Sequence, residues 1–407
     1  MRLLHTSDWH LGRRLCDCDR YRTFEQFLTW LTDLIAEQSV DTLLVAGDVF
    51  DTTTPSHQAQ KLYYDFLAGL QSTSCRHVVV IAGNHDSPTL LTAPKSLLNA
   101  LNVTVVGSPG ERCDDEIIAL HDGAGALQAV VCAIPYLRER DILHYGEHDT
   151  LREKDEAIAR ATALHYRRVV DRALELYDIA PNIPLIASGH LFAAGCTTQT
   201  SERNLYVGSL GVLPADTFPP EIDYLALGHL HHAQQLNGIA AGGYCGSPIP
   251  FDFGENQDKY VNIIDFDGKL TEIRKIPVPH FDRLRRIEGD VDSIVEAVGE
   301  LVRAQCDDWC EIIRTGGITG HNLKEIVDSL TQGAPLRVVR ICDASFEAAC
   351  LTSSDTTQSI KELTPSDIFE KRLARASDLD EETKRELRYC HDSIVYDILH
   401  EDVHANR

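Results

Sequence analysis

The chain has 407 residues, of which 38 are lysine or arginine and 62 are aspartate or glutamate, so its formal net charge is −24 at pH 7. This sign excludes proteins that hold nucleic acid by bulk electrostatic attraction, such as histone-like coating proteins. The length predicts two or three domains, and a composition of 43% hydrophobic and 25% charged residues is that of a globular protein.

The first 277 residues repeat one pattern, in which a short apolar run rich in β-branched residues ends at a glycine or an acidic residue. Such runs are typical of strands that are buried on both faces. Helical spacing of leucine and aromatic residues follows in 21–38 and 56–71. The five runs cover residues 2–7, 42–46, 78–82, 185–188 and 224–227.

Further elements in this region enlarge the predicted sheet structure. Residues 152–177 have the spacing of a long amphipathic helix. The elements indicate an α/β fold with one large sheet or a layered pair of sheets. Four more strands are predicted at 115–120, 127–134, 243–247 and 260–266.

After Pro277, Val278 and Pro279 the alternation starts again on a smaller scale. Strands and helices alternate in residues 281–345, which predicts a small β-α-β-α-β domain. The five elements are expected at 284–288, 291–305, 310–315, 321–332 and 336–342.

The last part of the chain differs in composition. Residues 346–363 contain the polar stretch TSSDTTQS and are predicted to form a linker. Residues 364–404 are predicted to form a helical hairpin with an apolar face that it is too small to bury by itself. This face packs either on the same chain or on a partner, and the polar linker favours a partner.

The sequence has no features of an exported or membrane-spanning chain. It contains no run of about 18 apolar residues. The N-terminal residues reach Asp8 before a secretory apolar region forms, so we expect a cytoplasmic protein. The 12 cysteines are scattered without a C-x-x-C pair, which predicts reduced thiols.

Each of the five strand ends carries side chains that bind metals. The carboxyl ends of strands form ligand crevices in open α/β sheets, so we expect these side chains to converge. The period of two in D-x-H and H-x-H points both side chains the same way where the backbone is extended. The candidates are Asp8 and His10 in DWH, Asp48 in GDVFD, Asn84 and His85 in GNHD, His190 in GH, and His229 and His231 in GHLH.

The ligand types indicate the chemistry of the site. Carboxylates, an amide and imidazoles without a thiolate suit manganese, iron or zinc better than calcium or copper(I). There are too many candidates for one ion, and with one bridging carboxylate they suit two ions about 3.5–4 Å apart, which is an arrangement for phosphoryl chemistry. Each motif is common by itself, whereas all five in order behind strands are hard to obtain by chance.

The set DWH, GDVFD, GNHD, GH and GHLH resembles the calcineurin-like metallophosphoesterase pattern over residues 1–277. More narrowly, HTSDWHLG, VAGDVFDT, IAGNHDS, YLALGHLHHAQ and YCGSPIPFDF resemble the SbcD family, the nuclease subunits of bacterial SbcCD complexes. The resemblance covers the whole chain. It implies a layered α/β/β/α metallophosphoesterase sandwich, a small α+β capping domain at 281–345 and a C-terminal helical hairpin.

The resemblance also implies roles for the matched residues. One metal is held by Asp8, His10, Asp48 and His231, and the other by Asp48, Asn84, His190 and His229, with Asp48 bridging. His85 is implied beside the phosphate, as a proton donor to the leaving oxygen or a stabiliser of transition-state charge. Asp51 matches the acid that orients this histidine in related phosphatases. In archaeal and eukaryotic nuclease relatives that position is often histidine, and the alternative role of Asp51 is a hydrogen bond within its turn.

The function implied is a Mn²⁺-dependent DNA endonuclease and exonuclease with a two-metal mechanism, Mg²⁺ or another divalent cation being an alternative. The resemblance implies that it works with the SbcC ATPase, as a homodimer within a heterotetramer, in DNA repair, replication and recombination. Residues 364–404 would bind the SbcC coiled coil. A metallophosphodiesterase with a non-nucleic-acid substrate and a scaffold with an inactive site are alternatives. The elements after residue 277 and the complete ligand set argue against these two.

DNA-contacting residues are harder to assign. Arg13 and Arg14 lie close behind DWH and are candidates for contacts with phosphate groups. Asp17 and Asp19 follow them, so the alternative is a solvated loop with paired charges.

Overall fold

A computed structural model of the chain describes residues 1–143, 151–177, 179, 182–193, 213, 217–236, 241–316, 323–343, and residues 369, 373, 384, 385, 387, 388 and 391. The chain divides into two compact units, residues 1–344 and 345–407. The predicted linker at 346–363 and nearly all of the predicted hairpin at 364–404 lie outside the described residues. None of the described helices is long and apolar enough to cross a membrane.

The first sheet has six strands in the described residues, in the order β12-β11-β1-β2-β3-β4. Its parallel strands are β1 (Arg2–Thr6), β2 (Thr42–Ala46), β3 (His77–Ile81) and β4 (Val103–Val106). Strands β11 (Tyr260–Asp267) and β12 (Lys269–Pro277) extend it in antiparallel fashion. The helices that follow β1, β2 and β3 are α1 (Tyr21–Glu37), α2 (His57–Gly69), α3 (Pro88–Thr92) and α4 (Lys95–Ala100).

The second sheet also has six strands in the described part of the chain, in the order β5-β6-β7-β8-β10-β9. Strands β6, β7, β8 and β10 are parallel, and β5 and β9 pair with them in antiparallel fashion. Helices α5 (Glu139–Ile142) and α6 (Leu151–Leu176) lie between β6 and β7 in the chain. The strands are β5 (Ile117–His121), β6 (Leu127–Ala133), β7 (Leu185–His190), β8 (Tyr224–Gly228), β9 (Gln234–Gln235) and β10 (Gly242–Tyr244).

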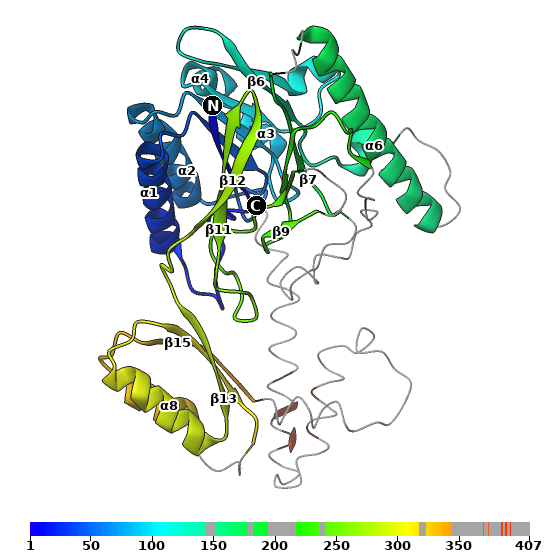
Figure 1. Cartoon of the computed structure of the whole chain (residues 1–407). Coiled ribbons are helices and arrows are strands. Elements are labelled where there is room, and N and C mark those ends of the chain that lie inside the picture. The colour runs from blue at the N-terminus through cyan, green and yellow to red at the C-terminus, as the bar shows by residue number, and fades with distance from the viewer. Residues whose placement is uncertain are drawn as a thin grey trace, which may run out of the picture. The chain divides into compact units, whose positions relative to one another are not determined.

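The two sheets pack face to face because successive strand residues point to opposite faces. In β1 and β2, Leu4 and Leu43 pack with α1 and α2, whereas Leu3 and Leu44 pack with residues of the second sheet. On the far side of that sheet, Val169 and neighbouring residues of α6 cover β6 and β7. The layers are therefore helix, sheet, sheet and helix, which confirms the predicted α/β/β/α sandwich (Figure 1).

A smaller three-stranded sheet follows β12, with its strands β13-β14-β15 all parallel. Ile294 and Val298 of one helix and Val327 of the other pack on the sheet, and Ile312 of the central strand lies beneath them. The elements alternate as β13 (Leu284–Gly289), α8 (Val291–Arg303), β14 (Trp309–Arg314), α9 (Leu323–Thr331) and β15 (Arg337–Asp343). This is the alternation that the sequence predicts.

Candidate metal centre

The predicted ligands lie where strands of both large sheets end. Asp8, Asp48 and Asn84 follow β1, β2 and β3 of the first sheet, while His190 ends β7 and His229 follows β8 of the second. The predicted ligands therefore converge at an edge that the two sheets of the sandwich share. The expectation from the sequence was convergence at the edge of an open sheet.

The backbone at these strand ends is left-handed at four of the predicted ligands. The φ angles are 53° at Asp8, 45° at His10, 50° at Asp48 and 105° at His229. The extended geometry that would align D-x-H and H-x-H by alternation is therefore absent at these positions. Turns bring the side chains together instead, and such conformations persist only where the surrounding structure holds them.

Two glycines allow the sheets to approach each other at this edge. A Cβ atom on Gly228 would lie 1.9 Å from the carbonyl oxygen of Ala46, at the end of β2. A Cβ atom on Gly47, whose φ is +88°, would lie 2.2 Å from Nδ1 of His190. Only glycine fits this close approach.

The first group of candidate ligands is Asp8, His10 and His231. One ligand atom from each lies within 4.8 Å of those of the other two, and all three residues are buried. The rings of His10 and His231 meet edge to face with centroids 5.1 Å apart. Ser7 Oγ donates a hydrogen bond of 2.5 Å to Asp8 Oδ2.

The second group is Asp48, Asn84, His190 and His229. His190 Nε2 lies 3.2 Å from Asp48 Oδ2 and 3.0 Å from Asn84 Oδ1, and His229 Nδ1 lies 3.1 Å from Asn84 Oδ1. Asp48 Oδ2 is also 3.5 Å from His10 Nε2. One carboxylate oxygen therefore lies between the two groups, and the structure brings all seven predicted ligands together.

The hydrogen bonds of His190 test whether a cation fits this place. Its Nδ1 donates to the carbonyl oxygen of Ala46 at 3.0 Å, which leaves a lone pair on Nε2 of the neutral ring. That lone pair faces the oxygens of Asp48 and Asn84, which are themselves acceptors. Burial acts to lower the pKa of His190, but the Asp48 carboxylate raises it to about 9. Converging lone pairs are what a metal ion requires.

The carboxylates provide a second test. Asp8 and Asp48 are fully or nearly fully buried, and no described lysine or arginine forms an ion pair with either. Burial raises the pKa of Asp8 to about 6. Burial also acts to raise the pKa of Asp48, but His190, His10 and His85 hold it well below its usual value. Ligand atoms of Asp8, Asp48 and His190 all lie within 4.8 Å of one another. Two buried carboxylates this close suit bound cations, so the residues present fit a divalent metal centre.

His85 lies beside the two groups, and its contacts differ from the expectation for Asp51. His85 Nδ1 donates to the main-chain carbonyl oxygen of Asp51 at 2.7 Å, while the Asp51 carboxylate lies 3.4 Å from His10 Nδ1. The hydrogen bond that orients His85 therefore comes from the backbone of Asp51, because the side chain turns toward His10. His85 Nε2 is buried and has no hydrogen-bond partner in the described structure.

Comparison with known proteins agrees with this geometry. A family model described as calcineurin-like phosphoesterase matches residues 1–233, and one described as type 5 capsule protein repressor C-terminal domain matches residues 280–377. The chain is 35% identical over 405 residues to an Escherichia coli K12 protein named as the D subunit of nuclease SbcCD, covering 98% of this chain and 99% of that protein. It belongs to the SbcD family of calcineurin-like phosphoesterases.

Other relatives carry the same name. The Rhodobacter capsulatus protein is 38% identical over 289 residues, which are 69% of each chain. The Bacillus subtilis protein is 34% identical over 269 residues, covering 65% of this chain and 66% of that protein. Among solved structures, a dimetal phosphatase from Danio rerio covers 69% of this chain and 99% of that chain at 13% identity, with a TM-score of 0.38, which is too low to add to the argument.

The arginines considered for DNA contacts in this SbcD-family chain are paired. Arg13 Nη1 lies 3.2 Å from Asp51 Oδ1, and its guanidinium lies over the ring of Phe251, 4.9 Å from the centroid. Arg14 Nε lies 3.1 Å from Asp19 Oδ1, and both side chains are more than half exposed. Of the two interleaved aspartates, Asp19 thus pairs with Arg14 through its carboxylate, as the alternative expected, while Asp17 accepts from Arg14 through its backbone oxygen, and Arg13 pairs with Asp51.

Asp86 is a structural residue of the site that sequence reasoning did not assign. It is completely buried and accepts hydrogen bonds from Gly83 N at 2.8 Å, Phe50 N at 3.0 Å and Val49 N at 3.2 Å. It therefore ties the loop after β2 to the loop after β3. Asp86 is the last residue of the GNHD motif, and this position was the signal from which its importance could have been predicted. A sequence pattern does not distinguish a carboxylate that binds a metal from one that accepts hydrogen bonds from backbone amides.

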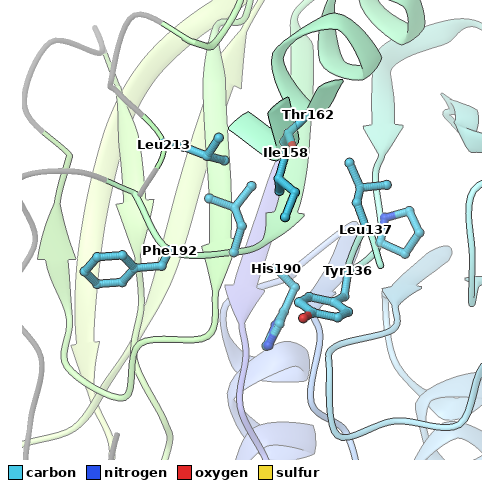
Figure 2. A pocket seen from close by; sticks show the side chains of 9 residues that line it. Tyr136, Leu137, Ile158, Thr162, His190, Phe192 and Leu213 are labelled. Atoms are coloured by element: carbon cyan, nitrogen blue, oxygen red, sulfur yellow. The ribbon is translucent and has the colours of Figure 1, made fainter. Parts of the chain in front are cut away.

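The segment after β6 closes one side of the centre. Tyr136 lies beside His190 with ring centroids 6.2 Å apart, and its backbone N–H donates to Ala82 O at 2.8 Å (Figure 2). The cavity behind these two residues is walled by apolar side chains including Leu137 and Phe192. It holds about 10 Å³, roughly the space of one water molecule, so it is no substrate pocket.

Proposed function

We propose that this SbcD-family protein is a DNA endonuclease and exonuclease that hydrolyses phosphodiester bonds at a centre of two divalent cations. The observation that carries the proposal is the meeting of seven nitrogen and oxygen ligands at the ends of five strands, with the Asp48 carboxylate between two groups. The curated relatives named as SbcCD nuclease subunits supply the substrate class.

The two groups suggest which residues hold which ion. We assign Asp8, His10, Asp48 and His231 to one cation and Asp48, Asn84, His190 and His229 to the other, with Asp48 bridging. We propose Mn²⁺ as the preferred ion, and the mixed imidazole and carboxylate donors support it without excluding Mg²⁺. When bound, such cations polarise a phosphoryl oxygen and neutralise the charge that develops on it.

The protein's own residues then handle protons and orientation. His85 Nδ1 is committed to the Asp51 carbonyl oxygen, so Nε2 is the atom that can carry a proton to the leaving sugar oxygen. The bond from His190 Nδ1 to Ala46 O points its Nε2 at Asp48. The Asp51 carboxylate, near His10 Nδ1 and Arg13, orients His10 in this proposal and acts on His85 only through its backbone.

We also propose how the chain is organised around this activity. Residues 1–277 form the nuclease domain, residues 281–345 a capping domain, residues 346–363 a linker and residues 364–404 a hairpin that binds the SbcC coiled coil. The new alternation that begins at β13 supports the boundary between the nuclease domain and the capping domain. The active assembly is an SbcCD heterotetramer with a homodimer of this chain, serving DNA repair, replication and recombination.

One experiment tests the proposed activity. The chain is purified with and without SbcC and assayed on labelled linear, hairpin and single-stranded DNA with Mn²⁺ or Mg²⁺, with and without ATP. Mn²⁺-dependent cleavage of DNA by the chain itself is expected, and ATP should matter only when SbcC is present. Hydrolysis of small phosphodiesters without DNA cleavage under all conditions would favour the alternative, a metallophosphodiesterase with another substrate.

The partner assignment has its own test. Deletion of residues 364–407 should abolish co-purification with SbcC and leave Mn²⁺-dependent nuclease activity in place. Survival of co-purification would contradict the assignment of the hairpin.

A further inference from the structure

The segment between β10 and β11, which includes GSPIPFDF, encloses His231, one of the proposed ligands. The carbonyl oxygen of His231 accepts hydrogen bonds from Ser247 N at 3.2 Å and from Lys259 Nζ at 3.0 Å. The ring of Phe251 packs edge on against those of His231 and His10, with centroids 5.1 and 5.2 Å apart. The segment therefore holds both the backbone and the ring of this histidine.

A buried ion pair lies at the centre of this enclosure. Glu255 and Lys259 are both 5% exposed, and Lys259 Nζ donates to Glu255 Oε2 at 2.8 Å and to Ser247 Oγ at 2.9 Å. The other carboxylate oxygen, Glu255 Oε1, lies 3.6 Å from His231 Nδ1. The distance is within ion-pair range and longer than an ordinary hydrogen bond, and it places the carboxylate on one edge of the ring.

We propose that Glu255 is a positioning residue of the metal centre, which directs Nε2 of His231 toward the ion shared with Asp8 and His10, while Lys259 fixes the carboxylate. The inference rests on the proposed two-metal function. A histidine ligand whose second nitrogen faces a carboxylate has a defined tautomer and ring orientation, and loss of the carboxylate typically lowers metal affinity about 10–100-fold.

A contribution to folding stability explains this buried ion pair less well than the positioning of His231 does. Replacing a buried ion pair by apolar or neutral groups of similar shape is often neutral or stabilising, whereas removing one partner leaves a buried charge uncompensated. Lys259 Nζ makes three contacts, with Glu255, Ser247 and the carbonyl of His231, and all three lead back to the same histidine. The Glu255–Lys259 pair is thus placed so that its contacts hold His231, the proposed ligand.

The test measures metal binding and first compares the full chain with Glu255→Gln, Lys259→Met and the double variant. Because each single variant leaves one buried partner alone, the double variant is the decisive one. Glu311→Gln serves as the matched control, since Glu311 is a buried, ion-paired glutamate of the small sheet. Metal-free protein is titrated with Co²⁺, with visible absorption reporting ligand geometry, and thermal melting of the metal-free protein reports folding.

The double variant should melt near the wild-type temperature and lose about 10–100-fold in affinity for one of two ions, with an altered spectrum for that ion. Glu311→Gln should bind both ions as the wild type does. In a His231→Ala background, Glu255→Gln should change the affinity by less than about twofold, because the two changes act through one side chain.

Wild-type affinity and spectrum for both ions in the double variant would overturn the inference. A loss of affinity in Glu255→Gln that the added Lys259→Met change restores would assign the pair a purely structural role and overturn it as well. A wild-type chain that binds two ions but cleaves no DNA would overturn the proposed function and leave the positioning role standing.

Discussion

The metal centre and the small sheet β13-β14-β15 both bury acidic side chains, but they neutralise them differently. Glu311 of β14 is completely buried, and Arg286 Nε donates to it at 2.6 Å while Arg340 contacts its other oxygen. Asp8 and Asp48 are buried just as deeply and face imidazoles and backbone amides instead. The protein thus supplies fixed cations of its own in one region, and in the other it leaves acids that suit external cations.

The backbone shows the same contrast. Four of the seven candidate ligands have left-handed φ angles. In the described residues of 284–343, the non-glycine residue with such a backbone is Gln305, which lies just past the end of α8. Among the described residues, nine non-glycine residues have a left-handed backbone, and four of them are candidate ligands. Strained backbone of this kind is often found at functional sites.

The largest effect is expected from Asp48→Ala, because Asp48 lies between the two ligand groups. The variant should lose bound metal and DNA cleavage together while remaining folded. Elemental analysis after dialysis measures the metal, and circular dichroism checks the fold. Retention of two ions would contradict the bridging role.

A smaller effect, on the cleavage rate and not on metal binding, is expected from His85→Gln. Because His85 is outside the proposed ligand set, metal content should remain unchanged, whereas the cleavage rate should fall about 10²–10⁴-fold, the usual contribution of a proton donor. Single-turnover cleavage of a labelled duplex measures the rate. Near-normal turnover would remove His85 from catalysis.

Glu311→Gln tests the same comparison in the small sheet, where a buried carboxylate is paired with arginines. Loss of this charge weakens its bonds to Arg286 and Arg340 and should destabilise the small sheet by about 1–3 kcal/mol. Metal content should not change. Thermal melting and elemental analysis of the same sample measure both quantities, and a loss of metal would show that the two regions are coupled.

The smallest effect is expected from neutralising Arg13 and Arg14 together, because both already pair with carboxylates. DNA affinity should fall less than about tenfold, and the slope of log K against log salt should fall by about 1. Binding measured by fluorescence anisotropy at several salt concentrations provides both values. An unchanged slope would leave these arginines as partners of Asp51 and Asp19 only.

The negative charge of the whole chain is compatible with this function. A total of −24 opposes bulk attraction to DNA, but two divalent cations would add four positive charges at the place where a phosphate group is bound. The acidic remainder of the surface would then limit unspecific coating of DNA.

The sequence patterns did not predict β4, β9 or β12, and the two-layered arrangement of the sheets came from the family resemblance. The patterns were sufficient for the five strands that carry the ligands and for the identity of the converging residues. The reason is that apolar runs predict strands from local pattern, and strands deliver their last residues to a common edge. The tertiary structure decided how the backbone brings these side chains together. Left-handed turns at Asp8, His10, Asp48 and His229 replace the expected alternation.

Contacts across long sequence distances were likewise outside the reach of the sequence. The hydrogen bond from His85 to the backbone of Asp51, the turn of the Asp51 carboxylate toward His10, and the carboxylate of Glu255 beside His231 all join segments that only packing brings together. Residue types and spacing determined which atoms this protein has available for binding a metal. The packing of two sheets against each other decided which of those atoms face one another, because side-chain direction at a turn depends on backbone angles that no local pattern specifies.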